Sequence, residues 1–233
     1  LPIFHEGNAR MYTDYMLMTA AKNVTRDVSL VFDFIERPYS PVRFKELLVS
    51  PNEMKQKFSR LINEEIKNKQ AGKPAYILIK INHITDPVMV KKLYEASSHG
   101  VRIDLLVRGN CSLITGVPGV SDTIRINGII DRYLEHSRIF IFANGGDEKM
   151  FIGSADWMPR NLDNRVEVIA PVYDPEIKAD LKRVVEYGLK DTLQGRVVDG
   201  TGENRPWISE DKTAFRSQEE LYKYYLNENR IKD

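Results

Sequence analysis

Blocks of apolar residues alternate along the chain between strand-like and helix-like spacing. Residues 75–81 and 101–107 are nearly continuous apolar runs with the length of a buried strand. Between them, Asp86 and Pro87 open a segment with helical spacing that ends before Gly100. This order predicts a βαβ unit with parallel strands, and ligands of open α/β sheets lie beyond the carboxyl ends of the strands. The residues expected at that edge are Lys80, Asn82, His83, Arg108 and Gly109.

The first part of the chain predicts one strand and one helix before a break. Residues 11–19 alternate in the manner of a strand, which would place Tyr12, Asp14, Met16 and Met18 on one face. Residues 25–36 have helical spacing, with an apolar stripe formed by Val28, Val31, Phe32 and Ile35. The segment 37–41 contains two prolines and predicts a domain boundary.

The remaining elements complete a mixed α/β pattern. Residues 50–53 resemble a capping box that opens a helix, whose core face would be Met54, Phe58, Leu61, Ile62 and Ile66. Residues 166–170 predict a strand, residues 174–190 a helix, and residues 199–212 a polar loop. A final short helix would be capped by residues 217–220. The pattern as a whole predicts an α/β fold with a mixed sheet.

Two aromatic-rich runs, residues 139–142 and 149–152, predict a hairpin with a tight turn between them. His136 and Arg138 would project together from the start of the first strand, because residues two apart in a strand share a face. Ser154 and Asp156 would leave the end of the second, so these four side chains could converge on one oxyanion. On this stretch alone, an ordinary hairpin with polar surface groups remains the favoured interpretation.

Composition narrows the class of protein without pointing to a partner. The 233 residues are 42% hydrophobic and 29% charged, which is typical of a globular protein, and the formal net charge of +1 predicts no nucleic-acid partner. The single Cys111 excludes an internal disulfide and fits a reducing compartment. No apolar run reaches the ~20 residues of a transmembrane segment, and we expect a cytoplasmic protein. Neither a Walker-type nor a G-x-G-x-x-G phosphate loop occurs, and no zinc pattern is present.

Two pairs of positions resemble the H-x-K and G-S-x-N motifs of the phospholipase D-like superfamily. They are His136 with Arg138, and Ser154 with Asp156, so that Arg replaces Lys and Asp replaces Asn. Four longer segments are similar, in the same order, to the bacterial polyphosphate kinase family. These segments are residues 9–15, 106–113, 131–136 and 154–158.

The resemblance implies a phospholipase D-like mixed sheet flanked by helices. Residues 1–45 would be the tail of a first catalytic domain, and residues 46–233 the second catalytic domain. The phosphorylated histidine of the family would lie upstream of this chain. The nucleotide and phosphate contacts would fall on Tyr12, Arg108 and His136, with His136 facing the phosphohistidine as acid/base or as a phosphate-orienting donor. The supporting residues would be Asp14, Arg138, Ser154 and Asp156.

The function implied is reversible transfer of the terminal phosphate of ATP to polyphosphate. ATP/ADP and inorganic polyphosphate would be the substrates, and Mg²⁺ would be held by ligands outside this chain. The N-terminal domains of the same polypeptide would be its partners, and we expect a homo-oligomer at full length. Two alternatives stay open: a dimeric phospholipase D-like phosphodiesterase or nuclease, and a non-catalytic module that binds polyphosphate or a partner domain.

Overall fold

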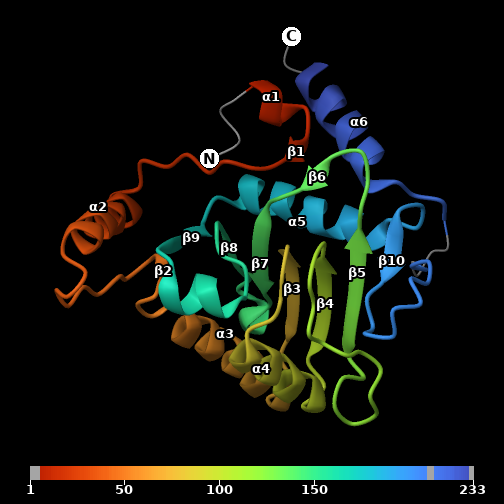
Figure 1. Ribbon diagram of the computed structural model, residues 1–233, viewed down its shortest axis with the longest axis horizontal. Coiled ribbons are helices and arrows are strands. Elements are labelled where there is room, and N and C mark those ends of the chain that lie inside the picture. The colour runs from red at the N-terminus through yellow and green to blue at the C-terminus, as the bar shows by residue number, and fades with distance from the viewer. Residues whose placement is uncertain (1–5, 209–212, 231–233) are drawn as a thin grey trace.

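The computed structural model describes residues 6–208 and 213–230. An eight-stranded mixed sheet forms its centre, in the order β10-β5-β4-β3-β7-β8-β9-β2 (Figure 1). The β3–β4 and β4–β5 pairs are parallel and the other pairs are antiparallel. The strands are β2 (Leu48–Ser50), β3 (Tyr76–Ile81), β4 (Arg102–Val107), β5 (Ile124–Ile129), β7 (Arg138–Phe142), β8 (Lys149–Gly153), β9 (Glu167–Val172) and β10 (Gly195–Val197).

Helices cover both faces of the sheet. Helices α3 (Met54–Gln70) and α4 (Pro87–Ser98) cover one face, and α5 (Pro175–Lys190) covers the other with α6 (Ser217–Arg230) against it. This arrangement confirms the predicted mixed sheet flanked by helices. The shorter elements are α1 (Glu6–Ala9), α2 (Lys22–Glu36), β1 (Tyr12–Thr13), β6 (Leu134–Glu135), η2 (Asn144–Gly146) and η3 (Arg160–Asn164).

Alternation along the central strands supplies a core on each side of the sheet. Ile77 and Ile79 of β3 belong to the cluster beneath α3 and α4, whereas Leu78 belongs to the cluster beneath α5. Trp157 is fully buried in the first cluster, with its ring centroid 5.8 Å from that of Phe140. Since the chain leaves β8 through Trp157, this packing fixes the segment that carries Asp156.

The βαβ unit and the hairpin are confirmed. Strands β3 and β4 pair in parallel with Tyr76 opposite Arg102. Asp86 caps α4, because its carboxylate accepts the N–H groups of Val88 and Met89, each at 3.0 Å. Strands β7 and β8 form the antiparallel hairpin, closed by η2. Residues 199–208 are irregular, as predicted, and residues 209–212 lie outside the described residues.

The strand predicted over residues 11–19 is wrong except at residues 12 and 13. Only Tyr12 and Thr13 form β1, which pairs in parallel with β6 and not with the large sheet. Met16 and Met18 are 49% and 83% exposed. Alternation alone does not hold a strand, because each strand needs a neighbour to pair its backbone groups.

The helix predicted over residues 25–36 is present, but its predicted apolar stripe is largely exposed. Val28, Phe32 and Ile35 are 40%, 64% and 54% exposed, and only Val31 of the predicted stripe is buried. The buried face instead carries Val24, Asp27, Val31 and Phe34. The Asp27 carboxylate accepts the backbone N–H groups of Glu46 (2.6 Å) and Leu47 (3.1 Å), which sets the rotation of the helix.

Two predicted helix caps are also wrong. The Ser50 hydroxyl donates to the carbonyl of Arg165 across the sheet, and α3 begins only at Met54. At α6, the Ser217 hydroxyl and backbone N–H both donate to the Asp191 carboxylate, and the N–H of Glu220, which a cap would bind, donates to the Arg216 carbonyl at 3.1 Å. In both cases a long-range partner takes the hydroxyl that the local pattern assigned to a cap.

Candidate functional site

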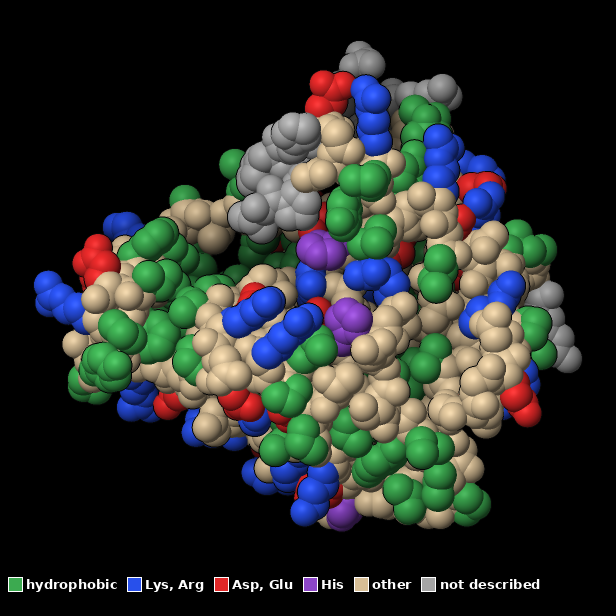
Figure 2. Space-filling view, in the orientation of Figure 1, with side chains coloured by type: hydrophobic (Ala, Val, Ile, Leu, Met, Phe, Trp, Pro, Cys, Tyr) green, Lys and Arg blue, Asp and Glu red, His purple; other side chains and the backbone are tan. Residues whose placement is uncertain are grey.

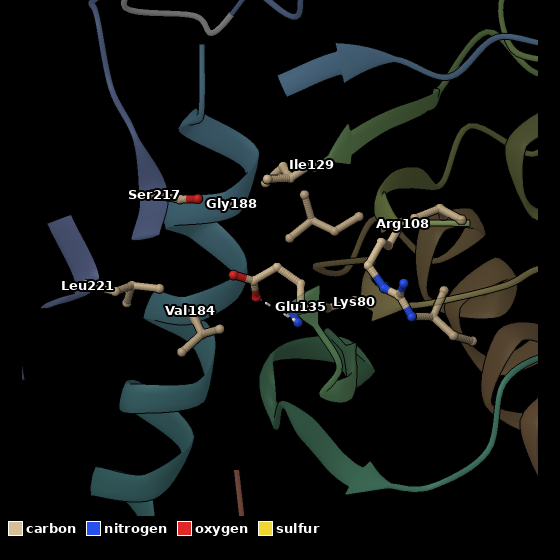
Figure 3. Close-up of a pocket in the computed structure, with 11 residues that line it drawn as sticks. Lys80, Arg108, Ile129, Glu135, Val184, Gly188, Ser217 and Leu221 are labelled. Carbon is tan, nitrogen blue, oxygen red and sulfur yellow. Dashed lines mark ion pairs between the residues drawn. The ribbon is translucent and has the colours of Figure 1, made fainter. Parts of the chain in front are cut away.

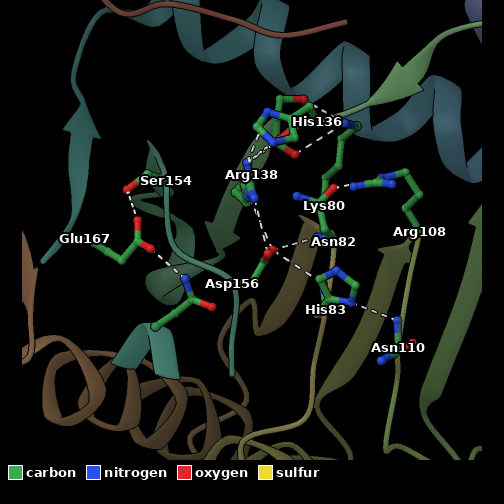
Figure 4. A network of polar contacts seen from close by, with 12 residues as sticks. Lys80, Asn82, His83, Arg108, Asn110, His136, Arg138, Ser154, Asp156 and Glu167 are labelled. Atoms are coloured by element: carbon green, nitrogen blue, oxygen red, sulfur yellow. Dashed lines mark hydrogen bonds and ion pairs between the residues drawn. The ribbon is translucent and has the colours of Figure 1, made fainter. Parts of the chain in front are cut away.

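Polar side chains gather where β3 and β4 end (Figure 4). Arg108 follows β4, and its Nε donates to Oδ1 of Asn82 at 3.0 Å. The N–H of Gly109 donates to the Asn82 carbonyl at 2.8 Å, and the N–H of Asn110 donates to Nδ1 of His83 at 2.9 Å. The structure therefore brings together the edge residues that the βαβ unit predicted.

Gly109 is the point of closest approach between these two strand ends. A Cβ atom at this position would lie 2.3 Å from Cε1 of His83 and 3.0 Å from the carbonyl oxygen of Asn82. Because those distances are below contact, only glycine lets the loop that carries Arg108 lie against β3.

His136 is held between the short strands and the start of β7. Its backbone N–H donates to the Thr13 carbonyl at 3.1 Å, and its Nδ1 lies 2.9 Å from Oδ2 of Asp14. A carboxylate only accepts, so we assign the proton of this bond to Nδ1, which leaves Nε2 for a ligand or for Arg138. The Tyr12 ring meets the imidazole edge to face, with centroids 5.4 Å apart.

The contact with His136 also lowers the pKa of the Asp14 carboxyl. Burial acts to raise its pKa, but the bonds from His136 and from the Tyr15 N–H, with the nearby charges of His136 and Lys80, hold that pKa below its ordinary value. Asp14 therefore stays a carboxylate that can orient the imidazole.

Arg138 and Asp156 form a bidentate pair beside this histidine. Nε and Nη2 of Arg138 each lie 3.2 Å from one oxygen of Asp156. Asp156 also accepts the backbone N–H groups of Asn82 (3.0 Å) and His83 (3.3 Å). Nη1 of Arg138 donates to the His136 carbonyl at 2.8 Å and lies 3.1 Å from Nε2 of the ring. Asp156 thus links the β7–β8 hairpin to the residues that follow β3.

Ser154 does not join this cluster. It is exposed, and its hydroxyl donates to Oε2 of Glu167 at 2.5 Å and accepts the N–H of Val168 at 3.2 Å. The other oxygen of Glu167 accepts Nδ2 of Asn161 at 2.6 Å. Of the four groups expected to converge, the contacts join His136, Arg138 and Asp156, while Ser154 belongs to a second polar group on β9.

Arg108 adds a positive charge near His136. Burial and the charge of Arg138 lower the pKa of Arg108, which nevertheless remains a cation at neutral pH. No carboxylate among residues 6–208 and 213–230 forms an ion pair with Arg108. A hollow of about 360 Å³ adjoins it and is lined also by Arg10 and Arg132. Figure 2 shows histidine side chains on this face with Lys and Arg side chains around them. The site is suited to an anion.

Four further polar residues lie in this region, and the family resemblance assigned them no role: Lys80, Asn82, Glu135 and Glu167. The βαβ pattern already placed Lys80 and Asn82 at the right edge, whereas nothing local distinguishes Glu135 or Glu167 from other surface carboxylates. Among the described residues, no group of three or more His, Cys, Asp or Glu side chains is placed to hold a metal ion. No helix of the described part of the chain has the length and apolar composition needed to cross a membrane.

The eight-stranded mixed sheet flanked by helices, with the H-x-R and G-S-x-D segments on its β7–β8 hairpin, defines an α/β domain with a polar site at the ends of its central strands. A family model described as "Polyphosphate kinase C-terminal domain 2" matches residues 47–218. The chain belongs to the polyphosphate kinase family.

Relatives and a solved structure agree with this assignment. The chain is 45% identical over 221 residues to "Polyphosphate kinase" of Escherichia coli strain K12, covering 95% of this chain and 32% of that protein. It is 44% identical over 224 residues to "Polyphosphate kinase" of Vibrio parahaemolyticus, covering 96% and 32%. The solved polyphosphate kinase from Porphyromonas gingivalis superposes with a TM-score of 0.90 at 39% identity, over 96% of this chain and 34% of that one. The chain thus spans about a third of the length of these relatives.

Proposed function

We propose that this chain supplies the second half of the phosphoryl-transfer site of a polyphosphate kinase. In the reaction, the terminal phosphate of ATP passes to a histidine with release of ADP, and the phosphohistidine then transfers it to the end of a polyphosphate chain. The observation that carries the proposal is the Arg108 guanidinium, which has no ion-pair partner among the described residues, near an imidazole that Asp14 and Arg138 hold in place.

Each candidate residue has a physical role in such a site. Arg108 forms no ion pair with a carboxylate of the described residues, so its guanidinium can stabilise the transferring phosphoryl group. His136 has Nδ1 engaged with Asp14, and its Nε2 can donate to or accept from a phosphate oxygen. Tyr12 packs on this ring and can present its face to a base or its hydroxyl to a phosphate. The nucleophilic histidine belongs to the other half-site, outside this chain.

The supporting residues act through these three. Asp14 orients His136, and Arg138 is fixed by Asp156 so that its guanidinium lies against the imidazole. Ser154 contacts none of these three residues; it bonds to Glu167 and would support the β9 side of the site.

We also propose that residues 1–45 are the tail of a preceding catalytic domain and residues 46–233 a second one. Helix α2 supports this division, because Val28, Phe32 and Ile35 form an exposed apolar stripe beside the exposed Tyr39. In the complete enzyme that stripe would pack against the first domain.

The division can be tested by comparing two phenylalanines of α2. Phe32→Ser should change the stability of the isolated chain by less than about 0.5 kcal/mol, because Phe32 is 64% exposed, but should cost several times more in the complete enzyme. The matched change Phe34→Ser should destabilise both proteins, since Phe34 is only 8% exposed. Equal effects of Phe32→Ser in the two proteins would refute the division.

The remaining partners follow from the same proposal. ATP/ADP and inorganic polyphosphate would be the substrates, Mg²⁺ would be held by ligands outside the chain, and the full-length enzyme would be a cytoplasmic homo-oligomer.

The function is tested by assaying this chain alone and joined to the upstream two-thirds of its relatives. The joined protein should convert ATP to ADP and polyphosphate, and the isolated chain should not, because its nucleophile is absent. Polymer growth by the isolated chain would contradict the proposal. Hydrolysis of a generic phosphodiester without any nucleotide would favour a phospholipase D-like hydrolase instead.

A further inference from the structure

The loop that presents His136 is clamped from outside by helix α6. Gln218 of α6 accepts the N–H of Tyr133 at 3.0 Å through Oε1 and donates to its carbonyl at 2.8 Å through Nε2. One side-chain amide therefore satisfies both backbone groups of a loop residue that is 85 positions away in sequence. The same Nε2 also donates to Oε1 of Glu135 at 2.7 Å.

Glu135 continues this contact toward the buried side of the loop. Its second oxygen lies 3.1 Å from Nζ of Lys80, which is 6% exposed and donates to the Ser137 hydroxyl at 2.7 Å. Figure 3 shows Lys80 and Glu135 paired at a hollow that Ser217 of α6 also lines. Both neighbours of His136 are thus fixed by side-chain bonds.

The position of Gln218 is itself fixed. The Asp191 carboxylate accepts the backbone N–H of Ser217 at 2.8 Å and its hydroxyl at 2.7 Å. Arg216 forms a bidentate pair with Asp131, with nitrogen–oxygen distances of 2.9 and 2.6 Å. The two residues that precede Gln218 are therefore both anchored by side-chain bonds.

On the other side, the loop is held by backbone bonds to residues 11–13 and by the contact of His136 with Asp14. The N–H of Leu134 donates to the Met11 carbonyl at 2.7 Å, and that of His136 donates to the Thr13 carbonyl. These contacts hold the side of the loop that faces residues 11–14, and Gln218 holds the opposite side.

We infer that Gln218 is a positioning residue for His136: by fixing Tyr133 and Glu135, it sets where the imidazole lies relative to Arg138 and Asp14. Its effect on turnover rests on the proposed function, but its effect on the imidazole does not. A catalytic group displaced by about 1 Å loses on the order of 10²-fold in rate, so a modest shift of the loop is enough to matter.

The first test is made on the chain itself, by NMR of the His136 ring resonances. Gln218→Ala should shift these resonances. Glu220→Ala is the control, because it removes a hydrogen bond of the same helix, that to Lys223, without touching the loop. Gln218→Glu should also shift them, because its carboxylate would put an acceptor oxygen against the Tyr133 carbonyl and the Glu135 carboxylate, which both need a donor. Unchanged His136 resonances in Gln218→Ala would overturn the inference, and so would loss of the fold in both Gln218 variants, because Gln218 would then act on stability alone.

The second test is made in the complete enzyme. Gln218→Ala should lower kcat by about tenfold or more while KM for ATP stays near the original value, because Arg108 and Tyr12 lie outside the clamped loop. If the resonances shift and kcat does not change, the proposed role of His136 fails while the positioning stands. If His136→Ala abolishes turnover but Gln218→Ala leaves both kcat and the resonances unchanged, the positioning fails and the proposed function stands.

Discussion

Arg138 and Asp156 form one bidentate ion pair, with both nitrogen–oxygen distances at 3.2 Å and side-chain exposures of 13% and 8%. These are the two positions at which the chain departs from the H-x-K and G-S-x-N motifs of the phospholipase D-like superfamily. Because the two departures contact each other, they are one structural feature: a guanidinium fork matched by a carboxylate. They do not argue against phosphate chemistry at this site.

This pairing predicts strong coupling between the two positions. Asp156→Asn should lower the free energy of unfolding by about 3–5 kcal/mol, because it leaves a mostly buried guanidinium without its partner. The double change Arg138→Lys with Asp156→Asn, which restores the superfamily motifs, should recover part of that loss. A urea-denaturation double-mutant cycle measures the coupling, and strictly additive single effects would refute it.

Asp27 should make the stability of the chain depend on pH. Burial acts to raise the pKa of its carboxyl, but the N–H groups of Glu46 and Leu47, with Arg26, hold the pKa below 3.8. Because the folded pKa is depressed, this stabilisation is complete above pH 3.8 and is lost as the pH falls through the folded pKa. Asp27→Asn should cost about 1.5–3 kcal/mol at neutral pH.

The pH dependence of that loss is the decisive measurement. The difference between the original chain and Asp27→Asn, measured by urea denaturation, should shrink as the pH falls below 3.8. Asp33→Asn is a control on the exposed side of the same helix and should change stability by less than about 0.5 kcal/mol. A difference that stays constant over the whole acid range would show that the Asp27 charge is not responsible.

Gly109 should not tolerate a side chain. Gly109→Ala places a methyl group 2.3 Å from the His83 ring and 3.0 Å from the Asn82 carbonyl, so the strand ends must separate. We expect a loss of about 1–3 kcal/mol in stability and a raised KM for ATP in the complete enzyme, since Asn82 no longer holds Arg108. Adding His83→Ala should relieve part of the strain. If Gly109→Ala leaves both stability and KM unchanged, the close contact of Gly109 with His83 and Asn82 is not needed for function.

The sequence predicted the elements whose signals are local. The Asp86–Pro87 start of α4 and the apolar runs of β3 and β4 need only their neighbours, and from them the position of Arg108 beside Asn82 follows. Long-range contacts decided the rest. Asp27 fixes the rotation of α2 through bonds to residues 19 and 20 positions away, and Gln218 reaches Tyr133 across 85 positions. These contacts join residues far apart in the sequence, so no local sequence pattern predicts them.

The most direct test of the central claim is the polyphosphate-synthesis rate of the complete enzyme with His136→Ala. The account predicts a fall of about 10²-fold or more, with the protein folded and its phosphohistidine still able to form elsewhere in the polypeptide. A rate equal to that of the unchanged enzyme would contradict it, and would leave this chain as a module that binds polyphosphate or a partner domain without taking part in the transfer.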